Sequence, residues 1–124
     1  MKKERAKYPF LAEKIVQMSD IILEVLDARF IPETRNSEIE EQIKKQDKKI
    51  IYAFNKADLI DIKKIKEEDI LLLNPKVFVS CINRKGGKEL RNKIKITSHN
   101  IKKPVDTALN KVTVGVIGYP NTGK

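Results

Sequence analysis

Residues 52–60 of the chain read YAFNKADLI, so that an apolar run leads directly into the polar segment Asn55-Lys56-Ala57-Asp58. The apolar residues from Ile50 to Phe54 predict a buried strand, and the polar segment then lies at the carboxyl end of that strand. Ligands of open α/β sheets bind at this end of the strands. The stretch therefore predicts an α/β fold and marks the place of a candidate binding site.

The side chains of this polar segment suit a guanine base. The Asp58 carboxylate can accept two hydrogen bonds side by side, and guanine offers N1–H and N2–H₂ in that spacing, whereas adenine has no such donor pair. Asn55 can bond another part of the ring or tie neighbouring loops together, and the stem of Lys56 can cover the base face. The alternative is an ordinary strand-to-helix loop with surface charges.

A second polar segment follows an apolar run at the other end of the sequence. After Lys111–Ile117 comes Gly118-Tyr119-Pro120-Asn121-Thr122-Gly123-Lys124, which matches most of a phosphate-binding loop of the form G-x-x-x-x-G-K. Its glycines let backbone N–H groups turn inward around an anion, and Lys124 would reach the β- and γ-phosphates. A simple glycine turn is the alternative reading.

A third candidate segment is Ser80-Cys81-Ile82-Asn83, which follows an apolar run beginning at Lys76. It could place a backbone N–H against the O6 atom of guanine. Cys81 is also well explained as a small buried apolar residue, because nothing in its sequence surroundings marks a lowered thiol pKa.

Composition excludes several classes of protein. A chain of 124 residues predicts a single domain. No apolar run approaches the length of about 18 residues that a membrane span needs, and the first ten residues lack the apolar core of a signal peptide. Cys81 is the single cysteine and His99 the single histidine. We therefore expect no disulfide framework, a reducing cytoplasm, and neither a His-based triad nor a multi-His metal site.

The chain is strongly basic. It has 26 lysines and arginines against 17 acidic residues, which gives a net charge of +9. Such a charge predicts an anionic partner, with RNA as the first choice. The alternative is that most of the lysines form solvated helix faces.

Strand and helix patterns alternate along the sequence. The expected strands cover residues 20–26, 49–54, 76–81 and 111–117, and the expected helices cover 3–18, 37–45, 61–69 and 88–96. Alternation of this kind predicts βαβ crossovers and a parallel sheet.

Several local details accompany this prediction. Ser37 and Glu40 have the spacing of a capping box, and Pro32 is expected in a loop. Ile39, Ile43, Ile62 and Ile65 are expected to point inward, and Met18 is expected on the apolar side of the first helix. The run 70–73, of sequence ILLL, is expected in the core, and residues 97–110 are expected to form a linker.

The order of the three segments is that of a known family. With NKAD first, Ser80-Cys81 second and GYPNTGK last, the chain resembles the circularly permuted GTPases of the YlqF/YawG type. The stretch from Asp27 to Asn36, of sequence DARFIPETRN, resembles the DAR-x-P segment of that family. The resemblance covers essentially the whole chain. It implies a three-layer P-loop NTPase fold with a parallel sheet, and residues 1–124 would be the N-terminal part of the permuted G domain.

The resemblance also implies roles for individual residues. It assigns guanine binding to Asn55, Lys56, Ala57 and Asp58, with support from Ser80 and Cys81, where Cys81 replaces the usual alanine. It assigns the phosphates of GTP or GDP to Gly118, Asn121, Thr122, Gly123 and Lys124. Asp27, Arg29 and Arg35 match a family signature, for which an ion pair, loop ordering and partner contact all stay open. Family members assist ribosome assembly, so ribosomal RNA or a ribosomal subunit is the expected partner.

The chain departs from the family after its phosphate loop. Neither a D-x-x-G loop nor the Ser or Thr that should follow Lys124 and bind Mg²⁺ occurs in the 124 residues. We therefore expect base recognition and part of phosphate recognition, with Mg²⁺ binding and GTP hydrolysis left to a longer protein. The competing hypothesis is a non-catalytic RNA-binding module that keeps a nucleotide-binding fold.

Overall fold

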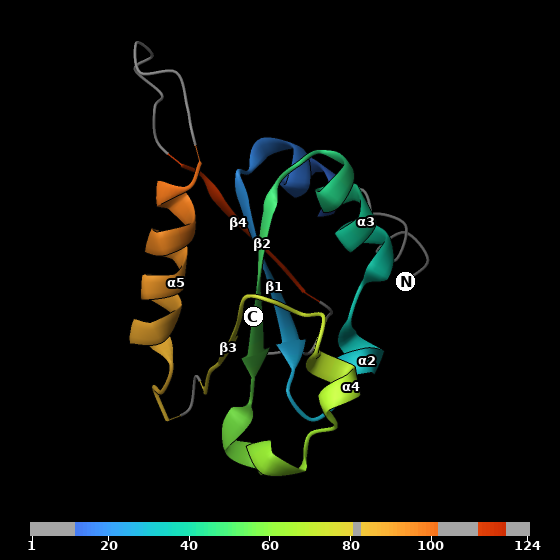
Figure 1. The fold of residues 1–124 in the computed structure, drawn as a ribbon, viewed down its shortest axis with the longest axis vertical. Helices are drawn as coiled ribbons and strands as arrows, with labels where there is room; N and C mark the ends of the chain where they lie inside the picture. Colours follow the sequence, from blue (N-terminus) through green and yellow to red (C-terminus); the bar gives the residue numbers. More distant parts are fainter. Residues whose placement is uncertain (1–11, 81–82, 102–111, 119–124) are drawn as a thin grey trace, which may run out of the picture.

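The computed structural model describes residues 12–80, 83–101 and 112–118. Within this part, four strands form one sheet in the order β3-β2-β1-β4, and every neighbouring pair is parallel (Figure 1). The strands are β1 (Ile21–Asp27), β2 (Lys49–Asn55), β3 (Lys76–Phe78) and β4 (Val114–Gly118). The predicted α/β class with a parallel sheet is confirmed.

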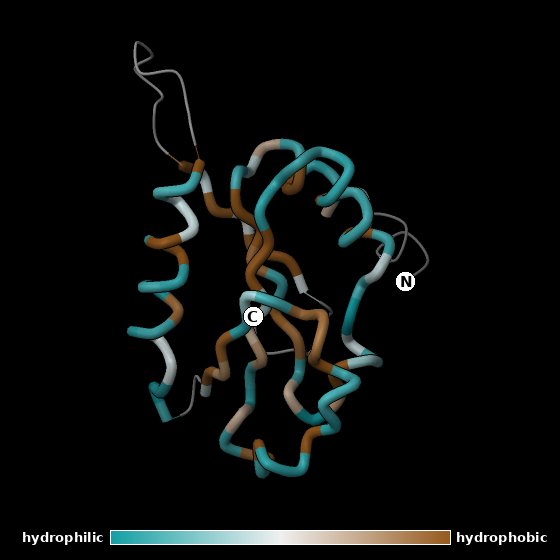
Figure 2. The backbone as a smooth tube through the Cα atoms, viewed as in Figure 1, coloured by the Kyte–Doolittle hydropathy of each residue, from teal (hydrophilic) through white to brown (hydrophobic). Residues whose placement is uncertain are grey.

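Helices cover both faces of the sheet, which gives three layers (Figure 1). The helix α5 (Gly87–His99) lies alone on one face. The opposite face is covered by a helix over residues 12–18, by α2 (Ile31–Thr34), by α3 (Ser37–Lys45) and by α4 (Glu67–Ile70). Figure 2 shows hydrophobic strands between these largely hydrophilic helices.

Alternate side chains of the central strand β1 enter two different parts of the core, because successive strand residues point to opposite faces. Ile21, Leu23 and Val25 pack toward α5 with Leu90 and Ile94. The other face of β1 packs toward the remaining helices. Both faces of β1 are buried, as expected for a central strand of a parallel sheet.

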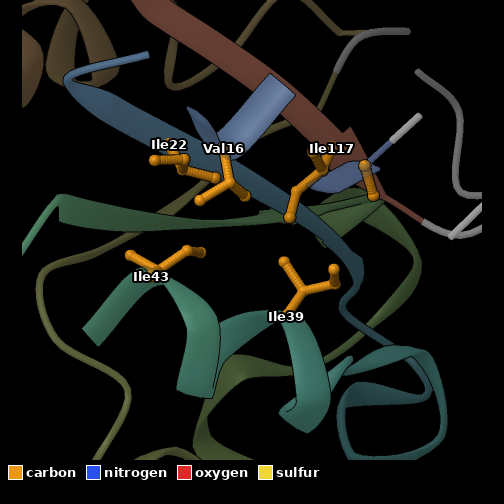
Figure 3. Packing of buried hydrophobic residues seen from close by; sticks show 6 residues of the cluster. Val16, Ile22, Ile39, Ile43 and Ile117 are labelled. Atoms are coloured by element: carbon orange, nitrogen blue, oxygen red, sulfur yellow. The ribbon is translucent and has the colours of Figure 1, made fainter. Parts of the chain in front are cut away.

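The core under α3 joins the first and last described elements. Ile22 of β1 and Ile117 of β4 lie close to Val16 from the helix over residues 12–18 and to Ile39 and Ile43 of α3 (Figure 3). The prediction that Ile39 and Ile43 point inward is confirmed, since Ile39 is 3% and Ile43 0% exposed. The segment 12–18 also covers β4 so closely that a Cβ atom at Gly115 would overlap the side chains of Ile15 and Ser19.

The predicted capping box of α3 is wrong. The cap is Asn36, whose side chain accepts a hydrogen bond from the backbone N–H of Ile39 at 3.2 Å, and Ser37 is the first residue of the helix. Asn is a strong N-cap residue, and it precedes Ser37 by one position. Glu40 does not reach back to the cap because it is paired with Arg35.

Two further local predictions fail in the loops on the same side of the sheet. Pro32 lies in the first turn of the short helix α2, where a backbone N–H would have no acceptor within the helix, so proline is tolerated. The expected helix over 61–69 is a 3₁₀ turn over Ile62–Lys64 followed by α4. Ile62 is half exposed, whereas Ile65 packs against the core as expected.

The run 70–73 is only partly buried. Leu73 enters the core, while Leu71 and Leu72 are 65% and 85% exposed, because α4 ends at Ile70 and the next residues form a turn. Strand β3 is also shorter than predicted and ends at Phe78.

The predicted boundaries of two helices also change. The helix α5 continues to His99, so residues 97–99 of the predicted linker are helical, and residues 102–110 lie outside the described part. Of the expected helix over 3–18, residues 12–18 are helical and 3–11 lie outside the description. Met18, which was expected on its apolar side, is 69% exposed.

Candidate functional site at the carboxyl end of the sheet

The NKAD segment is held between two neighbouring loops by backbone hydrogen bonds. The backbone N–H of Ala28, just after β1, donates to the carbonyl of Asn55 at 2.8 Å. On the other side, Val79 donates to the carbonyl of Phe54 at 2.9 Å, and Ala57 donates to the carbonyl of Val79 at 3.0 Å. The carboxyl ends of β1, β2 and β3 therefore form one edge, as the sequence predicts.

The side chain of Asp58 is joined to the loop after β3. The Ser80 hydroxyl donates to Asp58 Oδ1 at 2.7 Å and accepts from the backbone N–H of Asn83 at 3.2 Å. Ser80 itself is fixed, because it is 3% exposed and forms a two-way backbone bridge with Lys85. The structure therefore brings together two of the predicted guanine-binding segments, which are 22 residues apart in sequence.

The Asp58 carboxylate keeps capacity for further hydrogen bonds. A carboxylate offers about four acceptor positions on its two oxygens, and Ser80 uses one position on Oδ1. Asp58 is solvent-exposed, so donors of a ligand can reach it. The bond from Ser80 limits the rotation of the carboxylate without saturating it.

Lys56 lies in a strained turn beside a buried carboxylate. Its φ of 63° places it in the left-handed region, which a non-glycine residue rarely adopts. Its ammonium Nζ lies 3.5 Å from Asp27 Oδ2 at the end of β1. Strained backbone of this kind is typical of ligand sites, and the ion pair fixes the direction of the lysine stem.

Asp27 connects the DAR segment to the NKAD segment. Its Oδ1 accepts from the Arg29 backbone N–H at 2.9 Å and from Arg29 Nε at 3.0 Å, and its Oδ2 accepts from Arg29 Nη2 at 2.8 Å. These hydrogen bonds lower the pKa of the Asp27 carboxyl group and raise that of the Arg29 guanidinium. Of the roles that the sequence leaves open, an ion pair is the one seen for Asp27 and Arg29.

Arg35, the third signature residue, lies apart from the guanine-binding segments. Its Nε donates to both oxygens of Glu40 at 2.9 Å, and its Nη2 lies 2.8 Å from Glu40 Oε1. The hydroxyl of Tyr52 lies 3.5 Å from the same Oε1. Arg35 therefore takes part in a buried polar cluster between α3 and the sheet.

Glu24 completes this polar cluster and was missed by the sequence analysis. It is 1% exposed in the middle of β1, and its Oε2 accepts from the backbone N–H of Asn36 at 3.0 Å. The pKa of the Glu24 carboxyl group is raised to about 8, and burial is the largest cause, with the neighbouring charge of Glu40 acting in the same direction. A single carboxylate inside the apolar run IILEVL was the available signal.

The start of the phosphate-binding loop lies beside the same edge of the sheet. Gly118, the last residue of β4, is buried and pairs in register with Val25, two residues before Asp27. The remaining predicted phosphate-binding residues, Asn121 to Lys124, and Cys81 lie outside the described residues. Within the described part, no group of three or more His, Cys, Asp or Glu side chains could hold a metal ion.

A cavity of about 330 Å³ lies next to this edge, between α2 and the segment 60–69. Arg29 and Ile31 line it together with Lys64 and Asp69, but neither the NKAD segment nor Ser80 does. The candidate base site is therefore the exposed edge around Asp58, separate from this cavity. Among the residues that the structure covers, no helix has the length and apolar character to cross a membrane.

Comparison with known proteins identifies relatives over nearly the whole chain. An uncharacterised GTP-binding protein of Methanocaldococcus jannaschii is 40% identical over 114 residues, which is 92% of this chain and 29% of that protein. The GTPase grn1 of Schizosaccharomyces pombe is 33% identical over 97% of this chain and 28% of its own length. Nucleolar GTP-binding protein 2 of Saccharomyces cerevisiae is 33% identical over 90% of this chain and 23% of its own length.

No model of a known protein family matches the chain. The chain spans less than a third of the length of these relatives, so the similarity concerns the part that carries the three motif segments. Within that part, the order of the segments is permuted relative to ordinary small GTPases. The motif order and these similarities together show that the chain belongs to the circularly permuted GTP-binding proteins, and it corresponds to one part of each relative.

Proposed function

We propose that this chain binds guanine nucleotides, with the base at Asp58 and the phosphates at the loop that begins at Gly118. The observation that carries the proposal is the 2.7 Å hydrogen bond from Ser80 to Asp58 Oδ1. It holds a carboxylate at the carboxyl end of a parallel sheet, where nucleotides bind in such folds. The names of the relatives, which are GTP-binding proteins, point to the same ligand.

Each residue of the proposed base site has a distinct task. Asp58 accepts the N1–H and N2–H₂ donors of guanine, and the Ser80 hydroxyl orients that carboxylate. The stem of Lys56, held by its ion pair with Asp27, covers the base face. Asn55, buried at the end of β2, ties the DAR loop to the site through its carbonyl. Cys81 and the loop residues Asn121 to Lys124 complete the proposed contacts to base and phosphates.

Ribosome assembly is the proposed setting of this activity. It rests on the family resemblance and on the nucleolar and nuclear names of two yeast relatives. Ribosomal RNA or a ribosomal subunit is then the partner, and GTP hydrolysis with Mg²⁺ is proposed for a longer protein that carries the missing motifs. A cytoplasmic location belongs to the same proposal and rests on the single cysteine.

Calorimetric titration with GDP, IDP, ADP and XDP tests the base site. The wild-type chain should prefer GDP over IDP, which lacks the N2 donors, and should not bind ADP measurably. The substitution Asp58→Asn replaces an acceptor with a donor. It should lower the affinity for GDP about 10- to 100-fold, since each hydrogen bond to a charged group contributes about 1.5–3 kcal/mol. The preference should then shift to XDP.

Asp47→Asn is the matched control, because it makes the same chemical change in an exposed turn before β2, at the other end of the sheet. Asp47 has a φ of 56°, a conformation that Asn tolerates well. This variant should bind GDP like the wild type. Equal affinity of the wild-type chain for ADP and GDP, or an Asp58→Asn variant with unchanged preference, would refute the proposed base site.

A non-catalytic RNA-binding module is the second candidate function, and the net charge of +9 favours it. It predicts RNA binding that weakens steeply with salt and is indifferent to guanine nucleotides. This candidate is favoured over the first if calorimetric titration with nucleotides gives no heat of binding and if the chain binds RNA in a salt-sensitive way.

A further inference from the structure

More than half of the net positive charge is concentrated in one short segment. Residues 84–99 contain six lysines and arginines and a single carboxylate, Glu89, so they carry a net charge of +5 out of +9. The helix α3 on the opposite face of the sheet contrasts with this, because it has three glutamates and two lysines. Among the residues that the structure describes, the basic character is therefore strongest on the side of α5.

Three cations of α5 are exposed and form no ion pair with the residues that the structure describes. Lys88, Arg91 and Lys95 are solvent-exposed and lie three or four residues apart, which places them along one side of the helix. The inner side of α5 packs on the sheet through Leu90 and Ile94. Within the described part of the chain, no salt bridge joins Lys88, Arg91 or Lys95 to a carboxylate.

A groove of about 420 Å³ lies near the carboxyl end of α5, on a different side of the helix from this basic row. Lys93 and Asn100 line it from the side of α5, and Lys48 and Lys49 line it from the start of β2. No carboxylate is among its lining residues. Its volume falls in the range of small-ligand sites, so it can accept a unit of the size of a nucleotide.

The orientation of α5 separates this groove from the guanine site. The helix runs antiparallel to the strands, so its first turn lies near the carboxyl ends of the strands and its last turn near their amino ends (Figure 1). Asp58 follows the carboxyl end of β2, whereas Lys49 is the first residue of the same strand. A ligand on the groove therefore does not compete with a nucleotide at Asp58.

We propose that the outer row of α5 (Lys88, Arg91 and Lys95) and the groove (Lys48, Lys49 and Lys93), on two sides of the same helix, both bind the sugar-phosphate backbone of RNA. The inference rests on the proposed function in that it takes RNA as the partner, but it does not depend on nucleotide binding. Lysines and arginines that are not paired with carboxylates attract phosphates and release condensed counterions when they bind. We call these six residues the α5 basic surface.

The same surface indicates which part of RNA is recognised. Among the described residues, Phe30 is the exposed aromatic side chain, and it lies after β1, under the guanidinium of Arg29, rather than on α5. The described part of the α5 basic surface thus has no aromatic platform on which bases could stack. Contacts to phosphates position RNA without reading its sequence, so binding should tolerate different sequences.

Fluorescence anisotropy with a labelled oligouridine and a labelled RNA hairpin of mixed sequence tests the proposal on the 124-residue chain. About four phosphate contacts predict that the affinity for oligouridine falls about 50-fold between roughly 50 and 200 mM salt. The triple variant Lys88→Gln/Arg91→Gln/Lys95→Gln should bind at least about 10-fold more weakly at low salt. Its salt slope should be smaller by about 2, because three contacts are lost.

The matched control removes the same charge elsewhere. Lys63→Gln/Lys64→Gln/Lys66→Gln changes three exposed lysines before α4, on the opposite face of the sheet. It should keep most of the RNA affinity, and so should the charge-preserving variant Lys88→Arg/Lys95→Arg. An equal loss of affinity in both triple variants would mean that net charge alone binds RNA, and it would overturn the proposal.

Two further readouts separate this inference from the proposed function. GDP titration of the α5 triple variant should match the wild type, because Asp58 and Ser80 are unchanged. If the wild-type chain binds RNA through α5 but does not bind GDP, the result would support the α5 basic surface and refute the guanine site. Binding to phosphatidylglycerol vesicles with no binding to either RNA would overturn the proposed surface.

Discussion

The hydroxyl of Ser80 controls the candidate site at the scale of a single residue. Asp58 is exposed, and an exposed carboxylate normally samples several rotamers, which a ligand must fix when it binds. The bond from the buried Ser80 reduces that cost beforehand. The carboxylate therefore meets its ligand in a restricted orientation, and this restriction is what preorganisation contributes to affinity.

Ser80→Ala should weaken GDP binding about 2- to 10-fold, since the loss of a side chain ordered in advance costs about 0.5–1.5 kcal/mol on binding. Calorimetric titration against the wild type measures the change. The control is Ser98→Ala on α5, whose hydroxyl donates to the carbonyl of Lys95 far from the site. An unchanged affinity in the Ser80→Ala variant would show that the hydroxyl does not orient Asp58 for binding.

The sequence was sufficient to predict that Asp58 and Ser80 share an edge, because both follow strands of a parallel sheet. It was not sufficient to predict the pairing of Asp27 with Lys56. That contact depends on the left-handed backbone at Lys56 and on the register of β1 against β2, where Asp27 lies opposite Asn55. Neither property leaves a pattern in the sequence.

At the scale of secondary-structure elements, the buried carboxylate of β1 is the feature that strand patterns could not predict. Glu24 faces Glu40 and Arg35 from the side of α3, Tyr52 from β2 and the backbone N–H of Asn36. Burial is the largest cause of its raised pKa, and Arg35 only partly opposes the shift. The folded protein therefore holds a proton on Glu24 at pH values where an unfolded chain would release it.

This linkage predicts that stability falls as the pH rises. The pKa of Glu24 increases from 4.5 in a free side chain to about 8 in the folded protein. Between these values the folded state binds more protons than the unfolded state, so its free energy of unfolding decreases with increasing pH. The variant Glu24→Gln should remove this decrease and should be more stable than the wild type at pH 9. Urea unfolding at pH 5, 7 and 9 measures both effects.

Glu89→Gln on the surface of α5 is the control and should keep the wild-type pH dependence, because Glu89 is exposed. If Glu24→Gln retains the same loss of stability between pH 5 and 9, then another group carries the proton.

Sequence predictions of the elements were correct where the hydrophobic periodicity was strong. They failed where neighbouring residues could take the same role, as at the start of α3. The inward positions Ile39 and Ile43 follow directly from helical spacing. The cap of α3 does not, because Asn36 and Ser37 are both good caps, and the outcome depends on Glu40 being buried with Arg35. Similarly, Leu71 and Leu72 are as apolar as Leu73, but the turn after α4 allows only Leu73 into the core.

At the scale of the whole molecule, distant parts of the sequence meet at β4. The backbone N–H groups of Asp20 and Ile21 donate to the carbonyl of Thr113 at 2.8 and 3.1 Å, and the N–H of Thr113 donates to Asp20 Oδ2 at 2.8 Å. These bonds join residues 93 positions apart. They align β4 beside β1 and so place Gly118, the start of the phosphate-binding loop, at the edge that holds Asp58.

The packing of the segment 12–18 on β4 leads to the last prediction. Gly115→Ala would place a methyl group against the side chains of Ser19, which is buried, and Ile15, which packs against the core. Overpacking of this kind costs about 1–3 kcal/mol, and it would displace the strand that leads to Gly118. We therefore expect a lower free energy of unfolding in urea together with weaker GDP binding.

Gly87→Ala is the matched control, because a methyl group there would have no neighbour within 4 Å at the first position of α5. Alanine favours the helix over glycine by about 1 kcal/mol, so this variant should be as stable as the wild type or more stable. If Gly115→Ala has the same stability and the same GDP affinity as Gly87→Ala, the segment 12–18 is not closely packed against β4. The nucleotide site would then be independent of the amino-terminal helix.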